Sequence, residues 1–323
     1  MSGFQAEYPQ AEISNGQIHA KLYLPDAKTG FYRGTRFDWS GIISSLEFGG
    51  HDYYGPWFTK QDATVRDFVY RDPDIVVSTE SGSMGPADEF QTPLGYDAAE
   101  AGGTFIKVGV GVLRKPDKTQ YSAYKKYEIV SRGKWSTRKG PDYVEFTQEL
   151  NDPATGYGYL YRKTVRLTSG KPEMTIEHSL KNTGRQPIET KLYNHNFLTL
   201  DHSQTGDYVL RFPFEVTTSH PPNKDLAEVR GNEIVYLKTL QDHDTAALPV
   251  EGFGPTAKDY DIRVENKKLG AGFRVVGDRP LQSVALWSIR SVIAIEPFIA
   301  ISANPGQEMT WKYTYTYYAL PKE

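Results

Sequence analysis

The sequence predicts an all-β protein, organised as one large antiparallel β-sandwich over residues 1–323. Three observations support this class. Apolar and polar residues alternate along many segments, and no segment has the 3.6-residue periodicity of an amphipathic helix. The chain contains 29 Gly and 20 Pro, which separate these segments as turns. Aromatic residues make up 13% of the chain, with 22 Tyr, and such a composition favours sheets over helical bundles.

The clearest strand lies at 308–317, where five apolar residues recur at every second position. These residues are Met309, Trp311, Tyr313, Tyr315 and Tyr317. Polar residues occupy the positions between them, so one face of the strand is expected to be buried and the other solvated. Further strands are predicted at 104–113, 124–130, 142–150, 157–167, 174–181, 207–217, 228–237, 281–289 and 293–298.

Turn-forming residues lie between these strands, at 169–172, 182–184, 277–280 and 304–306. Because no helices alternate with the strands, the sheets are expected to be antiparallel. The segments 81–103 and 219–225 are predicted as long surface loops. No linker and no repeat of fixed period divides the chain, which favours a single domain.

Composition excludes several classes of protein. The chain has no Cys, so disulfides, thiolate metal sites and thiol nucleophiles are absent. Lys and Arg number 37 against 40 Asp and Glu, a balance that argues against a nucleic-acid partner. No apolar run approaches the roughly 20 residues that span a membrane, so no membrane partner is expected. Residues 1–7 do not resemble a signal peptide, which predicts a cytoplasmic protein, or a periplasmic one whose signal has been removed.

Common catalytic motifs are missing. The sequence contains no phosphate-binding loop, no strand-borne G-x-G-x-x-G, no H-E-x-x-H and no G-x-S-x-G. His195 together with Asp201 and His202 could be considered for zinc, but their spacing matches no known ligand set. We therefore predict neither a metal nor a cofactor.

Two segments carry candidate chemistry. In 192–201, polar residues including His195 gather at the end of a predicted strand. In 293–298, Glu296 is the one carboxylate in an otherwise apolar strand, where burial disfavours its charged form and should raise its pKa. A cation such as Arg36 would oppose this shift and leave the carboxylate ionised near neutral pH. The alternatives remain a capping or core role for His195 and a structural ion pair for Glu296.

These segments resemble the galactose mutarotase-like superfamily, which includes aldose 1-epimerases and hexose-6-phosphate mutarotases. Tyr-Asn-His-Asn-Phe at 193–197 is similar to the epimerases' Asn-His-x-Tyr-Phe segment, and Ile-Glu-Pro at 295–297 is similar to their Glu-Pro or Glu-Thr strand. The Asn-Pro-Gly turn at 304–306 before the last strand also resembles the family. The resemblance implies the galactose mutarotase-like supersandwich, with His195 as general acid and Glu296 as general base.

The resemblance also implies residues that bind the sugar. Arg36, in Tyr-Arg-Gly-Thr-Arg-Phe, is similar to the family's Gly-Arg segment, and Asn194 precedes the catalytic histidine. The family's His-Gly-Gly segment has no counterpart before position 130, so His51 is the proposed substitute for its second histidine. Tyr53 and Trp57 would supply aromatic faces for the apolar side of a sugar ring. Arg36 and at least one of these three residues should border the cleft that holds the catalytic pair.

The chemistry implied is the interconversion of sugar anomers on a small-molecule sugar. A base takes the proton of the C1 hydroxyl, an acid protonates the ring oxygen, and the opened sugar closes again after rotation of the carbonyl. One Glu and one His suffice, without metal or nucleotide. Two alternatives remain: the same fold serves elimination or hydrolysis of a modified glycoside, or the protein binds carbohydrate without catalysis.

Overall fold

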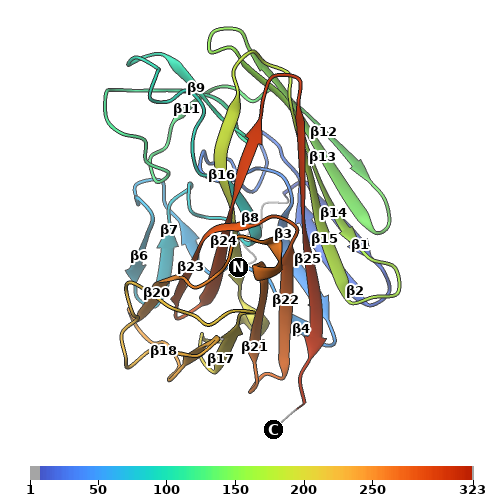
Figure 1. The fold of residues 1–323 in the computed structure, drawn as a ribbon, viewed down its shortest axis with the longest axis vertical. Helices are drawn as coiled ribbons and strands as arrows, with labels where there is room; N and C mark the ends of the chain where they lie inside the picture. The colour runs from blue at the N-terminus through green and yellow to red at the C-terminus, as the bar shows by residue number, and fades with distance from the viewer. Residues whose placement is uncertain (1–7, 322–323) are drawn as a thin grey trace, which may run out of the picture.

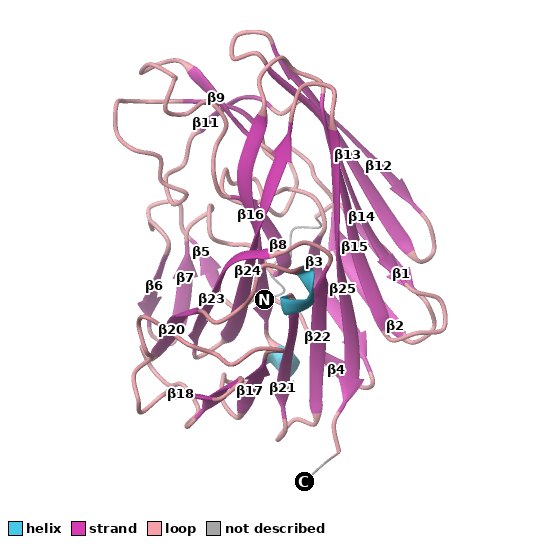
Figure 2. Cartoon of the chain, viewed as in Figure 1, coloured by secondary structure: helices cyan, strands magenta, loops and turns pink. Residues whose placement is uncertain are grey.

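Strands account for almost all regular structure in residues 8–321, which are the residues described by this computed structural model (Figure 1; Figure 2). Helical structure in this range is limited to two short 3₁₀ turns, η1 (Leu200–His202) and η2 (Ala257–Asp259). The predicted all-β class is confirmed. No helix in this range has the length and apolar character needed to cross a membrane. The prediction made for residues 1–7 lies outside the described residues.

The largest sheet has ten antiparallel strands and forms one side of the molecule (Figure 1). In spatial order its strands are β12 (Lys134–Lys139), β13 (Tyr143–Asp152), β14 (Tyr157–Leu167), β15 (Glu173–Asn182), β25 (Glu308–Ala319), β22 (Ala271–Gly277), β21 (Asp261–Asn266), β17 (Tyr208–Arg211), β19 (Glu233–Tyr236) and β18 (Ala227–Arg230). Their alternating apolar residues are buried on one face, as in β25, where Trp311, Tyr313, Tyr315 and Tyr317 are all buried.

A second antiparallel sheet of five strands positions the candidate site. Its spatial order is β20 (Thr245–Val250), β23 (Leu281–Ile289), β24 (Val292–Ala303), β16 (Ile188–Leu198) and β8 (Gly85–Phe90). One face packs on the ten-stranded sheet, where the Tyr315 hydroxyl donates to the side-chain oxygens of Asn194 and Asn196 at 3.1 and 2.7 Å. The opposite face is therefore available for a binding site.

Three smaller sheets complete the fold. The first contains β1 (Gln10–Ser14), β2 (Ile18–Tyr23), β3 (Ile42–Phe48) and β4 (His51–Asp52); the second contains β9 (Thr104–Lys107), β10 (Gly111–Arg114) and β11 (Glu128–Ser131). The third contains β5 (Lys60–Gln61), β6 (Phe68–Arg71) and β7 (Asp74–Val77). The β5–β7 pair is parallel, whereas all other strand pairs in the described range are antiparallel.

Several predicted strands agree with the structure and others do not. The predictions at 157–167 and 281–289 coincide with β14 and β23. The single strands predicted at 104–113 and 228–237 are instead hairpins, with Gly109 and Gly231 at positive φ in their turns.

The remaining differences concern the length of strands and one loop. The strand predicted at 124–130 begins only at Glu128, and the one at 207–217 ends at Arg211. The prediction of a surface loop at 81–103 is wrong, because β8 lies within it and all six of its residues are buried. Its charged residues suggested solvent exposure, but they are paired inside the protein, as described below. The segment 219–225 is a loop, as predicted.

Candidate active site

The strand register brings His195 and Glu296 together on the open face of the five-stranded sheet. In the antiparallel β16–β24 pair, Tyr193 lies opposite Phe298 and Asn196 opposite Ile295, which places His195 opposite Glu296. Their side chains meet with His195 Nε2 and Glu296 Oε1 3.1 Å apart. Two residues separated by about 100 positions in the sequence are thus direct cross-strand neighbours.

Both side chains line one cavity of about 470 Å³. Besides the pair, the lining comprises Arg36, Trp57, Asp67, Phe68, Ser81, Gln91, Tyr124, Tyr193, Phe197, Ala247, Leu248, Pro249, Ala285, Leu286, Trp287 and Phe298. A cavity of this size that combines aromatic walls with a few convergent polar groups is typical of small-molecule sites. As expected, His195 and Glu296 line the same cavity as Arg36 and Trp57.

Aromatic side chains build the walls of this cavity. Trp57 stacks on Phe197 with ring centroids 5.6 Å apart, and Trp287 meets Trp57 edge-on at the same distance. On the other side, Phe298 stacks on Tyr193 at 4.4 Å. Such rings offer flat apolar surfaces against which the C–H face of a sugar can pack.

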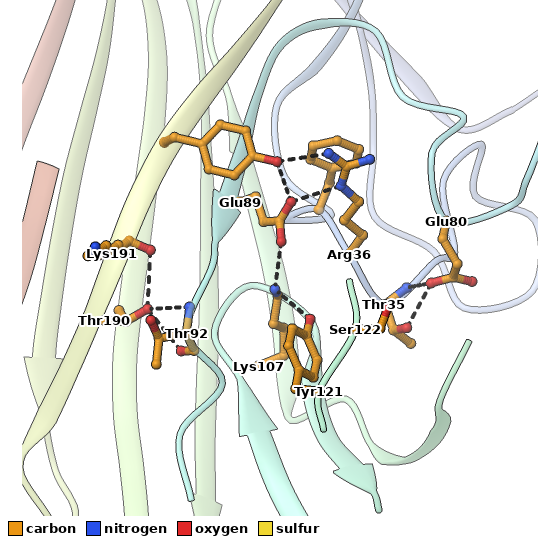
Figure 3. A network of polar contacts seen from close by, with 12 residues as sticks. Thr35, Arg36, Glu80, Glu89, Thr92, Lys107, Tyr121, Ser122, Thr190 and Lys191 are labelled. Carbon is orange, nitrogen blue, oxygen red and sulfur yellow. Dashed lines mark hydrogen bonds and ion pairs between the residues drawn. The ribbon is translucent and has the colours of Figure 1, made fainter. Parts of the chain in front are cut away.

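A buried ion network fixes Arg36 at the edge of the cavity (Figure 3). Arg36 Nε donates to Glu89 at 2.8 Å and its Nη2 donates to the Tyr193 hydroxyl at 2.9 Å. Glu89 also accepts a hydrogen bond from Lys107 Nζ at 3.1 Å, and Lys107 donates to the Tyr121 hydroxyl at 2.8 Å. With one carboxylate between two cations, the network holds a guanidinium in a fixed orientation beside His195 and Glu296.

Burial changes the protonation of His195 and Glu296. Desolvation raises the pKa of Glu296 to about 8, although the positive charge of Arg36 acts in the opposite direction. Desolvation lowers the pKa of His195 well below its usual range, and the Arg36 charge adds to this effect. The predicted upward shift of the Glu296 pKa is confirmed. The expectation that Arg36 keeps the carboxylate ionised is wrong, because burial outweighs the charge of Arg36.

The pair therefore shares a single proton near neutral pH. With a pKa of about 8, Glu296 carries that proton and can donate a hydrogen bond to Nε2 of the neutral His195 imidazole. The other imidazole nitrogen, Nδ1, is buried and has no hydrogen-bond partner among residues 8–321. Within the same range, no group of three His, Asp or Glu side chains could hold a metal ion.

No protein-family model and no curated protein matches the sequence. Solved structures do match it over nearly the whole chain. An aldose epimerase homologue from C. elegans is 15% identical, with a TM-score of 0.56 and coverage of 97% of this chain and 100% of the other. A galactose mutarotase-like protein from Clostridium acetobutylicum is 10% identical, with a TM-score of 0.54 and coverage of 99% and 98%. The chain has the galactose mutarotase-like fold.

Within this mutarotase-like fold, three of the predicted sugar-binding residues lie outside the cavity. His51 lies at another surface cavity, where its Nδ1 and Asp201 Oδ2 are 2.7 Å apart. Tyr53 is fully buried and donates to the carbonyls of Gly272 and Tyr318. His51 therefore cannot stand in for the family's second histidine next to His195, and Tyr53 cannot offer its ring to a sugar in this cavity, so both assignments are corrected.

Asn194 is kept out of the cavity by the alternation of side chains along β16. Successive side chains of a strand point to opposite faces, so Asn194 points away from the cavity that His195 lines. It is fully buried, donates to Asp88 Oδ1 at 3.0 Å and accepts from Tyr315. Its role in this structure is to join the two large sheets.

The cavity also contains residues that the sequence analysis missed. Tyr193 lies two positions from His195 and Phe298 two positions from Glu296 on the same strand, so period-two alternation could have identified them. Trp287 lies on the same face of β23, in a predicted strand but without a motif. Glu89 does not line the cavity but orients Arg36, and the sequence could not indicate it because its strand was predicted to be a loop.

Proposed function

We propose that the protein interconverts the anomers of a reducing sugar, with His195 and Glu296 as the acid–base pair. The observation that carries this proposal is the 3.1 Å approach of His195 Nε2 to Glu296 Oε1 in a cavity with aromatic walls. Ring opening requires one group that accepts the C1 hydroxyl proton and one that donates a proton to the ring oxygen. A pair that shares one proton supplies both functions in a single protonation state.

The direction of proton transfer follows from the pKa shifts. In the resting protein the proton resides on Glu296, so Glu296 is the donor and neutral His195 the acceptor. This exchanges the roles that the family resemblance implied. Ring closure on the other face of the carbonyl reverses both transfers and returns the proton to Glu296, so no net proton is consumed.

The remaining lining suits a sugar. The Arg36 guanidinium is oriented by Glu89 and Tyr193, and the rest of its hydrogen-bonding capacity faces Ser81 and Asp67 at 3.4 and 3.8 Å. Donors of this kind can bind sugar hydroxyls, while the aromatic walls pack against C–H groups. The names of the structural neighbours, an aldose epimerase homologue and a galactose mutarotase-like protein, agree with this proposal.

The test is anomer exchange measured by NMR or polarimetry on a panel of free aldoses. The wild type should accelerate equilibration of at least one aldose, His195→Asn should abolish the acceleration, and Glu296→Gln should strongly reduce it. Glu177→Gln is the matched control for carboxylate substitution, because Glu177 is exposed on β15, away from the cavity. A wild type that exchanges no aldose would refute the proposal; sugar binding without turnover would then favour a carbohydrate-binding protein, and cleavage of a glycoside would favour elimination or hydrolysis.

A further inference from the structure

Two cavities continue from the candidate active site along the protein surface. The first, of about 430 Å³, shares Tyr124 with the active-site cavity. The second, of about 410 Å³, shares Thr79 and Lys126 with the first. Because neighbouring stretches of the same loops line all three, we treat the two outer cavities as one continuous surface, called the basic groove below.

The basic groove has an excess of positive charge, although the whole chain has a net charge of −3. Its lining contains five cations and two carboxylates: Arg33, Arg66, Lys125, Lys126 and Arg132, with Glu80 and Glu128. Both carboxylates already accept hydrogen bonds. Glu80 accepts one from the Thr35 hydroxyl (Figure 3), and Glu128 accepts one from Arg114 Nε at 2.8 Å. Of the five cations, only Lys125 has a carboxylate partner within residues 8–321, Asp117 at 2.7 Å.

Arg132 adds a second, independent observation. Its Nε is buried, yet it has no hydrogen-bond acceptor among the residues that the structure describes. Its guanidinium lies 5.7 Å from the centroid of the Trp39 ring, which holds it at the groove. That nitrogen has almost no accessible surface, so a ligand cannot reach it directly. What Arg132 offers an anionic ligand in the groove is the charge of a guanidinium that has no carboxylate partner among residues 8–321.

Other groups in the groove fit a carbohydrate. Hydroxyl groups of Thr64, Ser78, Thr79 and Ser122 lie in its lining. At the junction with the active site, the guanidinium carbons of Arg36 and Arg66 lie 4.7 and 5.9 Å from the centroid of the partly exposed Tyr124 ring. The exposed part of this ring can contact a sugar as a chain passes from one cavity to the next.

We propose that the substrate is the reducing end of an anionic oligosaccharide, whose carboxylated or sulfated rings lie in the basic groove. The unpaired cations bind the anionic groups, and the terminal sugar reaches His195 and Glu296. The placement of the terminal sugar rests on the proposed function, whereas binding of the chain in the groove does not. A free monosaccharide would leave the groove empty and its cations without partners.

The test is electrophoresis through native gels in which polygalacturonate, dextran sulfate or, for comparison, transfer RNA is covalently fixed to the matrix, so that the polyanion itself cannot migrate. Fully methyl-esterified polygalacturonate and plain dextran present the same backbones without the charges. Wild type should be retarded in at least one charged gel relative to its neutral counterpart. The double variant Lys126→Gln/Arg132→Gln should weaken the apparent affinity about tenfold, which corresponds to about 1.4 kcal/mol.

The matched control is Lys134→Gln/Lys139→Gln. It removes the same charge from exposed positions of the neighbouring strand β12, outside the groove, and should change the affinity less than twofold. Thermal unfolding reports whether the variants fold, and Lys126→Gln alone, at an exposed position, keeps the test valid if the Arg132 variant does not.

Three results would overturn the inference: no retardation in either charged gel, an equal loss in both double variants, or stronger retardation by transfer RNA than by either polysaccharide. Retardation requires no turnover, and anomer exchange of neutral aldoses requires no groove. Failure of one proposal is therefore distinguishable from failure of the other.

Discussion

Replacement of Glu296 by Gln should separate catalysis from stability. Gln keeps the volume of the side chain and can still donate a hydrogen bond to His195 Nε2, but it cannot transfer a proton. The rate of anomer exchange should fall by roughly 100-fold or more, the usual contribution of general acid–base catalysis. Folding should not be harmed, because the carboxyl group that Gln replaces is itself uncharged near neutral pH.

The pKa shift predicts that the wild type loses stability relative to Glu296→Gln as pH rises. Folding raises the pKa of Glu296 from 4.5 to about 8, so the native state binds more protons than the unfolded state between these values. The free energy of unfolding of the wild type therefore falls as pH increases through this window. At pH 7 the loss is on the order of 3 kcal/mol relative to a side chain that does not titrate, since each pKa unit corresponds to about 1.4 kcal/mol.

The assay combines anomer exchange with calorimetric unfolding at pH 5 and pH 8. At pH 5 the two proteins should have nearly equal melting temperatures. At pH 8 Glu296→Gln should melt several degrees higher, since about 1 kcal/mol corresponds to a few degrees in a protein of this size. An unchanged exchange rate would show that Glu296 has no catalytic role. A difference in melting temperature that does not depend on pH would refute the reasoning about its burial.

Three further predictions concern the same cavity. The pH profile of exchange should be bell-shaped. Its basic limb should lie near pH 8, where the pair loses its proton, and its acidic limb below pH 6.5, because the pKa of His195 is lowered. A flat rate profile across pH 5–9 would contradict the shared proton. Arg36→Gln should move the basic limb to higher pH, because Arg36 lowers the pKa of Glu296. If the basic limb of the steady-state rate does not move, Arg36 has no influence on the Glu296 pKa. Trp287→Ala should raise KM about threefold to tenfold, because a lost aromatic contact costs roughly 0.5–1.5 kcal/mol. As a control, His51→Ala should leave KM and kcat unchanged, because His51 lies at a different cavity.

Local sequence patterns determined the class of fold and the identity of the central pair. Alternation at period two is a property of the strand itself, so 157–167 and 281–289 could be predicted to the residue. The pattern fails where a glycine at positive φ reverses the chain, as at Gly109, because alternation continues on both sides of a tight turn. Glu296 stood out as a carboxylate in an apolar stretch and His195 as part of a polar cluster at the end of a predicted strand, and a family resemblance marked both.

Tertiary structure decided the rest. The β16–β24 register is set by pairing of residues far apart in the chain, and it alone makes His195 and Glu296 neighbours and directs Asn194 to the opposite face. Likewise, Glu89 lies in a buried strand because Arg36 and Lys107 neutralise it, and those partners come from distant segments. A charged residue in a sequence is expected to be exposed to solvent. Whether it is buried depends on the partners that folding brings to it, and these partners cannot be read from the local sequence.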